Sequence, residues 1–280
     1  MGSKAKYAKQ LLVAMSENCN LSEYENWVEP FVGGANMIAE VANMVRWGND
    51  INPYIIEMFK AIQNGWVPSD KYSEEDYRLA KENAKLTWKT TSPVLMIAPD
   101  LMIAEIGFIG IGCSYSGKWF GGYARGNANN GKPRNYAKES KDNLLKQKPF
   151  IQDVVFSCQH YKNMYIPKTK SIIYCDPPYV MTTKYKEQFE SDKFWDWCSE
   201  MAQKGHKVFV SEYQAPEGWK CIWEKVVNSS LTKETGSKQA TERLFTNYGY
   251  QILCHNCNQA KNIKGVCPHQ SFAITGKSPS

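Results

Sequence analysis

The sequence predicts an α/β fold built on a mainly parallel sheet, and two observations lead to it. Residues 171–175, SIIYC, form a short, apolar and β-branched run of the kind that buried parallel strands contain. A second such run, at 27–32, ends at Gly33 and Gly34 and precedes apolar residues at helical spacing. Strand, glycine turn and helix in this order are typical of the first unit of a nucleotide-binding sheet.

The other expected elements continue this alternation on both sides of residues 64–165. Within that range a polar helix at 73–86 precedes a segment rich in glycine and aromatic residues, so we expect a mainly helical and loop insertion there. One domain would then comprise 1–63 and 166–250, with a separate tail at 251–280. The remaining expected elements are helices at 3–15, 35–45, 55–62 and 192–203 and a strand at 207–211.

Composition limits the class of protein. No apolar run approaches the ~20 residues needed to span a bilayer, and the first residues lack the hydrophobic segment of a signal peptide. Nine cysteines, an odd number, do not suit a secreted disulfide framework. We therefore expect a cytoplasmic protein with no membrane partner.

Two motifs stand where nucleotide-binding sheets place their ligands. In EPFVGGAN, residues 29–36, two glycines let a ligand approach the backbone, although an ordinary tight turn would read the same. Asp50 lies 17 residues after Gly33, near the ~20 at which an acid grips ribose hydroxyls, although a loop or capping acid is the alternative.

The second motif, DPPY at 176–179, is more specific. Asp176 follows the buried strand, and Pro177 lacks an N–H, so the loop is stiff and its carbonyl groups stay free to accept hydrogen bonds. Tyr179 adds a flat aromatic face. An acceptor side chain, an acceptor carbonyl and a stacking ring together suit a planar substrate that bears an amino group.

EPFVGG and DPPY, in this order and separated by a basic aromatic insertion, resemble the Dam-type DNA adenine methyltransferases over roughly residues 2–250. The resemblance implies a Rossmann-like methyltransferase sheet, S-adenosylmethionine as the cofactor and N6 of adenine in duplex DNA as the target. It implies catalytic roles for Asp176, Pro177 and Tyr179. Cofactor-binding roles are implied for Lys4 (in GSK, 2–4), Phe31, Gly33, Asp50 and Asp176. Ala35 departs from the F-x-G-x-G pattern of the family, where a second glycine stands.

The chemistry of the residues agrees with this resemblance. The adenine amino group is a weak nucleophile because its lone pair is delocalised into the ring. Acceptance of its two hydrogens by the Asp176 carboxylate and the Pro177 carbonyl returns electron density to nitrogen, and stacking on Tyr179 holds it in line with the methyl group. Such positioning supplies on the order of 7–11 kcal/mol in favourable cases. The base must first leave the duplex, since its amino group is inaccessible there. Cys175, on the other side of the strand, is expected in the core.

The insertion corresponds to the target-recognition region of this family. The chain has a net charge of +6, and between Lys118 and Lys148 eight Lys or Arg residues stand against two acidic ones. Lys118, Tyr123 and Arg125 are the expected DNA contacts, with a solvated basic loop as the alternative for each. We expect the enzyme to act as a monomer. The recognition sequence, and whether the enzyme serves a restriction system, a phage or a regulatory switch, stay open.

The tail at 251–280 concentrates cysteine and histidine. Its sequence LCHNCNQAKNIKGVCPHQ resembles the zinc-binding end of HNH endonucleases, without the half that carries their catalytic histidine. Cys254, Cys257, Cys267 and His269 would complete a tetrahedral zinc site, with His255 as an alternative ligand. Reduced thiols in an unstructured tail are the other interpretation.

Two rival functions remain at this point. The first is an amino-methyltransferase acting on cytosine N4 or on an amide; those enzymes usually carry Ser or Asn in place of the Asp, so Asp176 favours adenine. The second is a DNA-binding relative that has lost catalysis, against which intact Lys4, Asp50 and DPPY argue.

Overall fold

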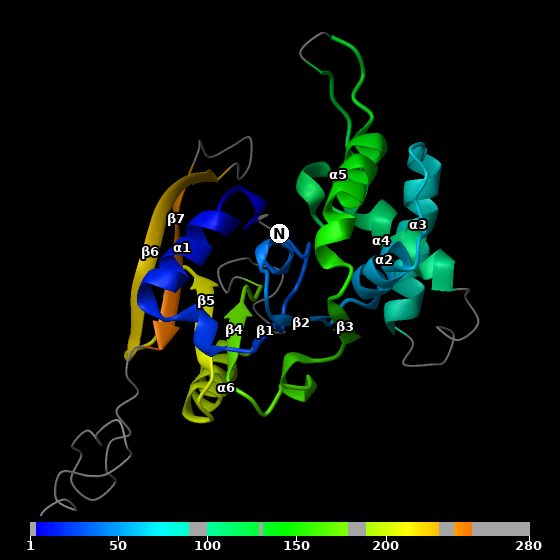
Figure 1. Cartoon of the computed structure of the whole chain (residues 1–280). Coiled ribbons are helices and arrows are strands. Elements are labelled where there is room, and N and C mark those ends of the chain that lie inside the picture. Colours follow the sequence, from blue (N-terminus) through cyan, green and yellow to red (C-terminus); the bar gives the residue numbers. More distant parts are fainter. Residues whose placement is uncertain (1–3, 90–99, 129–130, 179–188, 230–237, 248–280) are drawn as a thin grey trace, which may run out of the picture.

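A seven-stranded sheet forms the centre of the protein (Figure 1). The computed structural model describes residues 4–89, 100–128, 131–178, 189–229 and 238–247. The strand order is β3-β2-β1-β4-β5-β7-β6. The strands are β1 (Asn26–Glu29), β2 (Val45–Asp50), β3 (Val155–Cys158), β4 (Ser171–Cys175), β5 (Lys207–Glu212), β6 (Trp219–Ser229) and β7 (Lys238–Asn247).

The first five strands run parallel, and β7 runs antiparallel between β5 and β6. Strand β1 pairs with β2 on one side and with β4 on the other, so the direction of winding reverses between β1 and β4. Open α/β sheets bind their ligands at this switch point, outside the carboxyl ends of the strands. The predicted α/β fold is confirmed, with a sheet order consistent with the Rossmann-like methyltransferase fold.

Both faces of the sheet are covered. Along β4, Ile172 and Tyr174 belong to one apolar cluster, while Ile173 and Cys175 belong to the cluster under α6 on the other face. All four side chains are at most 1% exposed, as the sequence of this strand predicts. The helices are α1 (Ala8–Asn18), α2 (Pro53–Gln63), α3 (Glu74–Lys89), α4 (Asp100–Gly112), α5 (Tyr136–Ile151) and α6 (Ser191–Gln203), with short 3₁₀ turns η1 (Lys4–Lys6), η2 (Leu21–Glu23), η3 (Ile38–Glu40), η5 (Tyr115–Gly117) and η6 (Tyr161–Asn163).

The predicted helix at 35–45 is wrong. Only the single turn η3 forms there, and Val45 already begins β2. Ala35 and Asn43 have left-handed φ values of 54° and 62°, which an α-helix cannot contain. The Arg46 guanidinium binds the carbonyl oxygens of this segment, as described below. Met37, Ile38 and Val41 are buried, but on an irregular loop, so their spacing imitated a helix, while Val45 is 52% exposed.

The inserted region has a core of its own, formed by α3, α4 and α5 with side chains such as Tyr77, Ile106 and Phe120. Gly107 brings α4 against α2, because a Cβ at this position would lie 2.2 Å from the Tyr54 carbonyl oxygen. Strand β3 lies inside the range 64–165 yet pairs with β2, so the sheet resumes at Val155 rather than at residue 166.

Candidate active site at the switch point of the sheet

The candidate site lies where β2, β1 and β4 end side by side. Asp50 ends β2, the glycine turn follows β1, and Asp176 follows β4. Three segments that are far apart in the sequence therefore bring their polar groups to one edge of the sheet. This is the arrangement that the sequence motifs predict.

Asp50 holds the glycine turn. Its two carboxylate oxygens accept hydrogen bonds from the Gly33 amide at 3.1 Å and from the Asn52 amide at 2.9 Å. Burial raises the pKa of Asp50, and the backbone donors oppose that shift. The structure thus joins two of the predicted cofactor-binding residues directly.

The turn itself is left-handed at two positions. Gly33 has a φ of 48° and Ala35 a φ of 54°, whereas Gly34 is not left-handed. Ala35 stands where the F-x-G-x-G pattern has its second glycine, and its backbone adopts the left-handed conformation that glycine adopts most easily. The Ala35 methyl group is fully buried, so packing holds the residue in a conformation that L-residues rarely adopt.

Phe31 belongs to an aromatic cluster beside the turn. Its ring centroid lies 5.3 Å from that of Tyr161, 5.7 Å from that of Phe194 and 6.0 Å from that of Phe189. The ring is only partly buried, so one side of this cluster reaches the surface near the glycine turn. The cluster fixes the backbone between β1 and Gly33.

Lys4 joins the amino-terminal segment to Asp176 of the DPPY motif. Its Nζ lies 3.4 Å from Asp176 Oδ1 and 2.7 Å from Glu242 Oε2, and the Lys4 side chain is only 7% exposed. Burial acts to lower the pKa of Lys4, but the two carboxylates outweigh it and the pKa is raised. Lys4 therefore carries its positive charge between two acids. Glu242, on β7, was not predicted.

A second unpredicted acid, Glu29, ends β1. It is 2% exposed, and its Oε1 accepts a hydrogen bond from Trp27 Nε1 at 2.7 Å. Burial raises the pKa of Glu29 to about 8; the Trp27 hydrogen bond opposes this shift, and the charge of Asp176 adds to it. Glu29 is therefore mostly protonated at neutral pH. EPF contained this residue, but its burial depends on packing that the motif does not specify.

The remaining predicted site residues fall into two groups. Pro177 is buried directly after Asp176. Tyr179 and the residues Cys254, Cys257, Cys267 and His269 lie outside the described residues. Within the described part of the chain, no group of three or more His, Cys, Asp or Glu side chains could hold a metal ion.

The three predicted DNA contacts lie in the inserted region. Lys118 is exposed after η5. Arg125 is exposed and pairs with Glu74 at the start of α3. Tyr123 is packed more than expected, because its hydroxyl donates to the Tyr72 carbonyl at 2.7 Å.

A basic hairpin extends from this region. Residues 124–128 and 131–135 precede α5 and project beyond it (Figure 1). Asn127 and Pro133 form an antiparallel bridge across the hairpin. Its exposed basic side chains are Arg125, Lys132 and Arg134.

Sheet order, glycine turn and a carboxylate after β4 together are consistent with an S-adenosylmethionine-dependent methyltransferase. Residues 1–238 match the model of the D12 class N6 adenine-specific DNA methyltransferases, and the chain belongs to this family. A comparison with curated proteins found no match. The chain is thus an adenine-specific DNA methyltransferase that uses S-adenosylmethionine, and the cytosine, amide and inactive alternatives are set aside. In the described ranges, no helix is long and apolar enough to cross a membrane.

The raised pKa of Glu29 leads to a prediction of how the stability of the folded protein depends on pH. An unfolded Glu29 ionises near its ordinary pKa of 4.5, while the folded side chain stays protonated up to about pH 8. The unfolded state therefore binds fewer protons between these values, and Glu29 lowers stability as pH rises through this window. Glu29→Gln keeps an acceptor for Trp27 and cannot ionise. The difference in free energy of unfolding between Glu29→Gln and the wild type should grow in favour of the variant as pH rises. It should be roughly 3–5 kcal/mol larger at pH 8 than near pH 5.

Urea denaturation of both proteins across this range checks the expectation, with the exposed Glu40→Gln as the matched control. A constant difference between Glu29→Gln and the wild type at all pH values would contradict it.

Proposed function

We propose that the enzyme methylates N6 of an adenine flipped out of duplex DNA within a specific sequence, and that Asp176 and the Pro177 carbonyl activate the amino group. The observation that supports this most is the position of Asp176, held by Lys4 at the end of β4 beside the glycine turn. The cofactor supplies the methyl group as a sulfonium, so the sulfur–methyl bond breaks as the nitrogen–methyl bond forms.

Two acceptors and one aromatic ring act on the adenine base. The Asp176 carboxylate and the Pro177 carbonyl each accept one N–H, which strengthens the nucleophile. Tyr179 stacks on the base and sets its plane. The nitrogen loses one proton on methylation, and the Asp176 carboxylate, already bonded to it, accepts this proton before passing it to solvent.

The charges of the site suit the proposed cofactor. Lys4, Asp176 and Glu242 carry one positive and two negative charges, which leaves a net negative site for a sulfonium cation. In this proposal Lys4 also faces the carboxylate of the methionine end. Asp50 accepts a ribose hydroxyl, since a carboxylate has about four lone-pair positions and three backbone amides, those of Gly33, Ile51 and Asn52, act on it. Phe31 and Gly33 form the adjoining wall.

The DNA-binding surface in this proposal is the inserted region, which we keep as the target-recognition unit within 64–165. Arg125, Lys132 and Arg134 on the hairpin, together with Lys118, present positive charge to phosphates. Tyr123 helps to fix this surface through the hydrogen bond that its hydroxyl donates to the Tyr72 carbonyl. A single site with one recognition unit is consistent with action as a monomer, and DNA as the substrate agrees with a cytoplasmic location.

The first test of this proposal is transfer of labelled methyl from S-adenosylmethionine to plasmid DNA. Label should appear as N6-methyladenine, and Asp176→Ala should reduce turnover by about 10²–10⁴-fold because the acceptor is lost. Tyr179→Ala should cost less, and Tyr179→Phe or Trp least, because stacking survives. Lys4→Ala and Asp50→Ala should mainly weaken cofactor affinity. The exposed Asp142→Ala is the control. Label in cytosine, RNA or protein would refute the proposed function. Unchanged cofactor affinity in both Lys4→Ala and Asp50→Ala would refute the cofactor-binding roles of these two residues.

A second test concerns the hairpin. DNA affinity should fall steeply with salt, and Arg125→Glu or Arg134→Glu should weaken binding and reduce the salt slope by about 1–2. Lys204→Glu is a matched control, since Lys204 is also exposed and paired with a glutamate. Binding titrations over a range of salt concentrations decide the point. Sensitivity at Lys220 and Lys225 of β6 with none at the hairpin would move the DNA to another surface.

We also propose one structural zinc ion in the tail, held by Cys254, Cys257, Cys267 and His269. The support is their spacing in the sequence. Elemental analysis of protein purified without chelator should find about one zinc per chain, and Cys254→Ser should lower it, because a tetrahedral site needs every ligand. Cys158→Ser, which removes an exposed thiol elsewhere, should not. Metal-free wild-type protein would exclude the site.

A further inference from the structure

The side chain of Gln147, on α5, is hydrogen-bonded to the glycine turn. The Gln147 amide nitrogen donates to the Gly34 carbonyl at 3.0 Å and to the Ala35 carbonyl at 2.9 Å. A glutamine amide has two N–H groups, so both are used on this turn. The inserted region therefore contacts the segment that we propose for cofactor binding.

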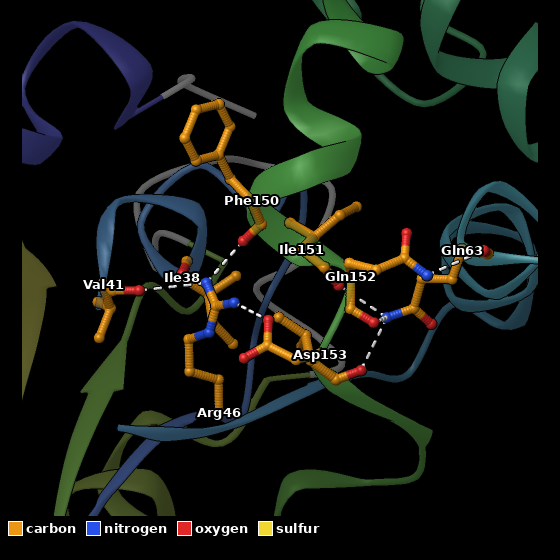
Figure 2. Close-up of polar contacts among 9 residues, drawn as sticks. Ile38, Val41, Arg46, Gln63, Phe150, Ile151, Gln152 and Asp153 are labelled. Carbon is orange, nitrogen blue, oxygen red and sulfur yellow. Dashed lines mark hydrogen bonds and ion pairs between the residues drawn. The ribbon is translucent and has the colours of Figure 1, made fainter. Parts of the chain in front are cut away.

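A buried arginine fixes the end of the same helix (Figure 2). Arg46, on β2, is 6% exposed and donates to the carbonyl groups of Ile38 at 2.9 Å, Val41 at 3.2 Å and Phe150 at 2.6 Å. Asp153 balances its charge. Arg46 thus ties the loop after the glycine turn to the carboxyl end of α5.

Gln63, at the end of α2, binds the chain as it leaves α5. Its amide nitrogen donates to the Ile151 carbonyl at 2.7 Å (Figure 2). It also donates to the Val154 carbonyl at 2.9 Å. The last carbonyl groups of a helix have no partner within it, so these side chains satisfy them. Helix α5 is therefore anchored on β2, on α2 and on the glycine turn.

The amino end of α5 meets the basic hairpin. Asn135 caps the helix, its Oδ1 accepting from the Lys138 amide at 2.9 Å, and Arg134 pairs with Glu139 in the first turn. Gln147 lies 12 residues after Asn135, about 18 Å along the helix, and Pro149 interrupts the helix only beyond it. One rigid element thus runs from the proposed DNA contacts to the proposed cofactor turn.

We propose that Gln147 is a positioning residue that couples DNA binding to cofactor binding. The turn contains two left-handed residues, one of them an alanine, so its active shape needs external support. Gln147 supplies that support from α5. DNA bound at the hairpin acts on α5, which moves as a unit, and through Gln147 favours the active shape of the turn. Cofactor on the turn favours DNA binding in return, because coupling is reciprocal. This inference rests on the proposed function.

The test compares Gln147→Met, which keeps the size and removes both donors, with Asn143→Leu, which removes an exposed amide one turn away on α5. Calorimetry measures the Kd of S-adenosylhomocysteine without DNA and with plasmid DNA that the wild type methylates. DNA should tighten this Kd about fivefold or more in the wild type and in Asn143→Leu. In Gln147→Met the Kd should rise and the effect of DNA should disappear.

Kinetics separates positioning from a merely structural role. Gln147→Met should raise KM for S-adenosylmethionine in step with Kd and leave kcat close to the wild-type value, with an unchanged Tm. Should Gln147→Met fail to fold, Gln147→Glu, whose carboxylate repels the two carbonyl groups, gives the same comparison. Wild-type coupling retained in a folded Gln147 variant, or no coupling in the wild type, would overturn the inference. Absence of methyl transfer by the wild type would instead refute the proposed function.

Discussion

The pairing of β1 with two parallel neighbours is the constraint on which the site depends. Register places Glu29 beside Gly48 of β2 and Val28 beside Ile173 of β4, so the ends of all three strands reach the same edge. No side chain of the site would meet another without this register. The hydrogen bond from Gly33 to Asp50 then closes the turn against β2, and the rest of the site is arranged around it.

The sequence predicted the parts of the site that follow directly from strand ends. Asp176 follows the apolar strand β4 directly, so its position needed only the fold, whereas Asp50, the last residue of β2, was predicted from its place 17 residues after Gly33. Glu242 could not be predicted, because it reaches Lys4 through an antiparallel strand that joins the sheet late in the chain. The helix expected at 35–45 does not form for a related reason, since it too depends on tertiary contacts. The Arg46 side chain donates hydrogen bonds to the Ile38 and Val41 carbonyl groups, which a helix would pair with its own amides.

Charge in the site is arranged so that few groups are ionised without a partner. Lys4 stands between Asp176 and Glu242, and Glu29, the most buried of the acids, stays protonated at neutral pH. Neutral Glu29 adds no further negative charge beside Asp176. The site therefore keeps the Asp176 carboxylate ionised at the end of β4. Of the neighbouring acids, Glu242 shares Lys4 with it and Glu29 is uncharged at neutral pH.

The entry and exit of the inserted region are bound to each other. Gln63 donates to the Gln152 carbonyl at 3.3 Å, and Gln152 donates back to the Gln63 carbonyl at 3.0 Å (Figure 2). This reciprocal pair forms a neck, which we define as Gln63 and Gln152, and it holds the two ends of the insertion together. The distance between these ends is therefore independent of the length of the insertion. The entropy of closing a longer loop grows only slowly with its length. Residues in the outer part of the insertion, such as the hairpin, can thus vary in number and kind without altering the register of β2 and β3, whereas Gln147, close to the neck, stays bound to the glycine turn.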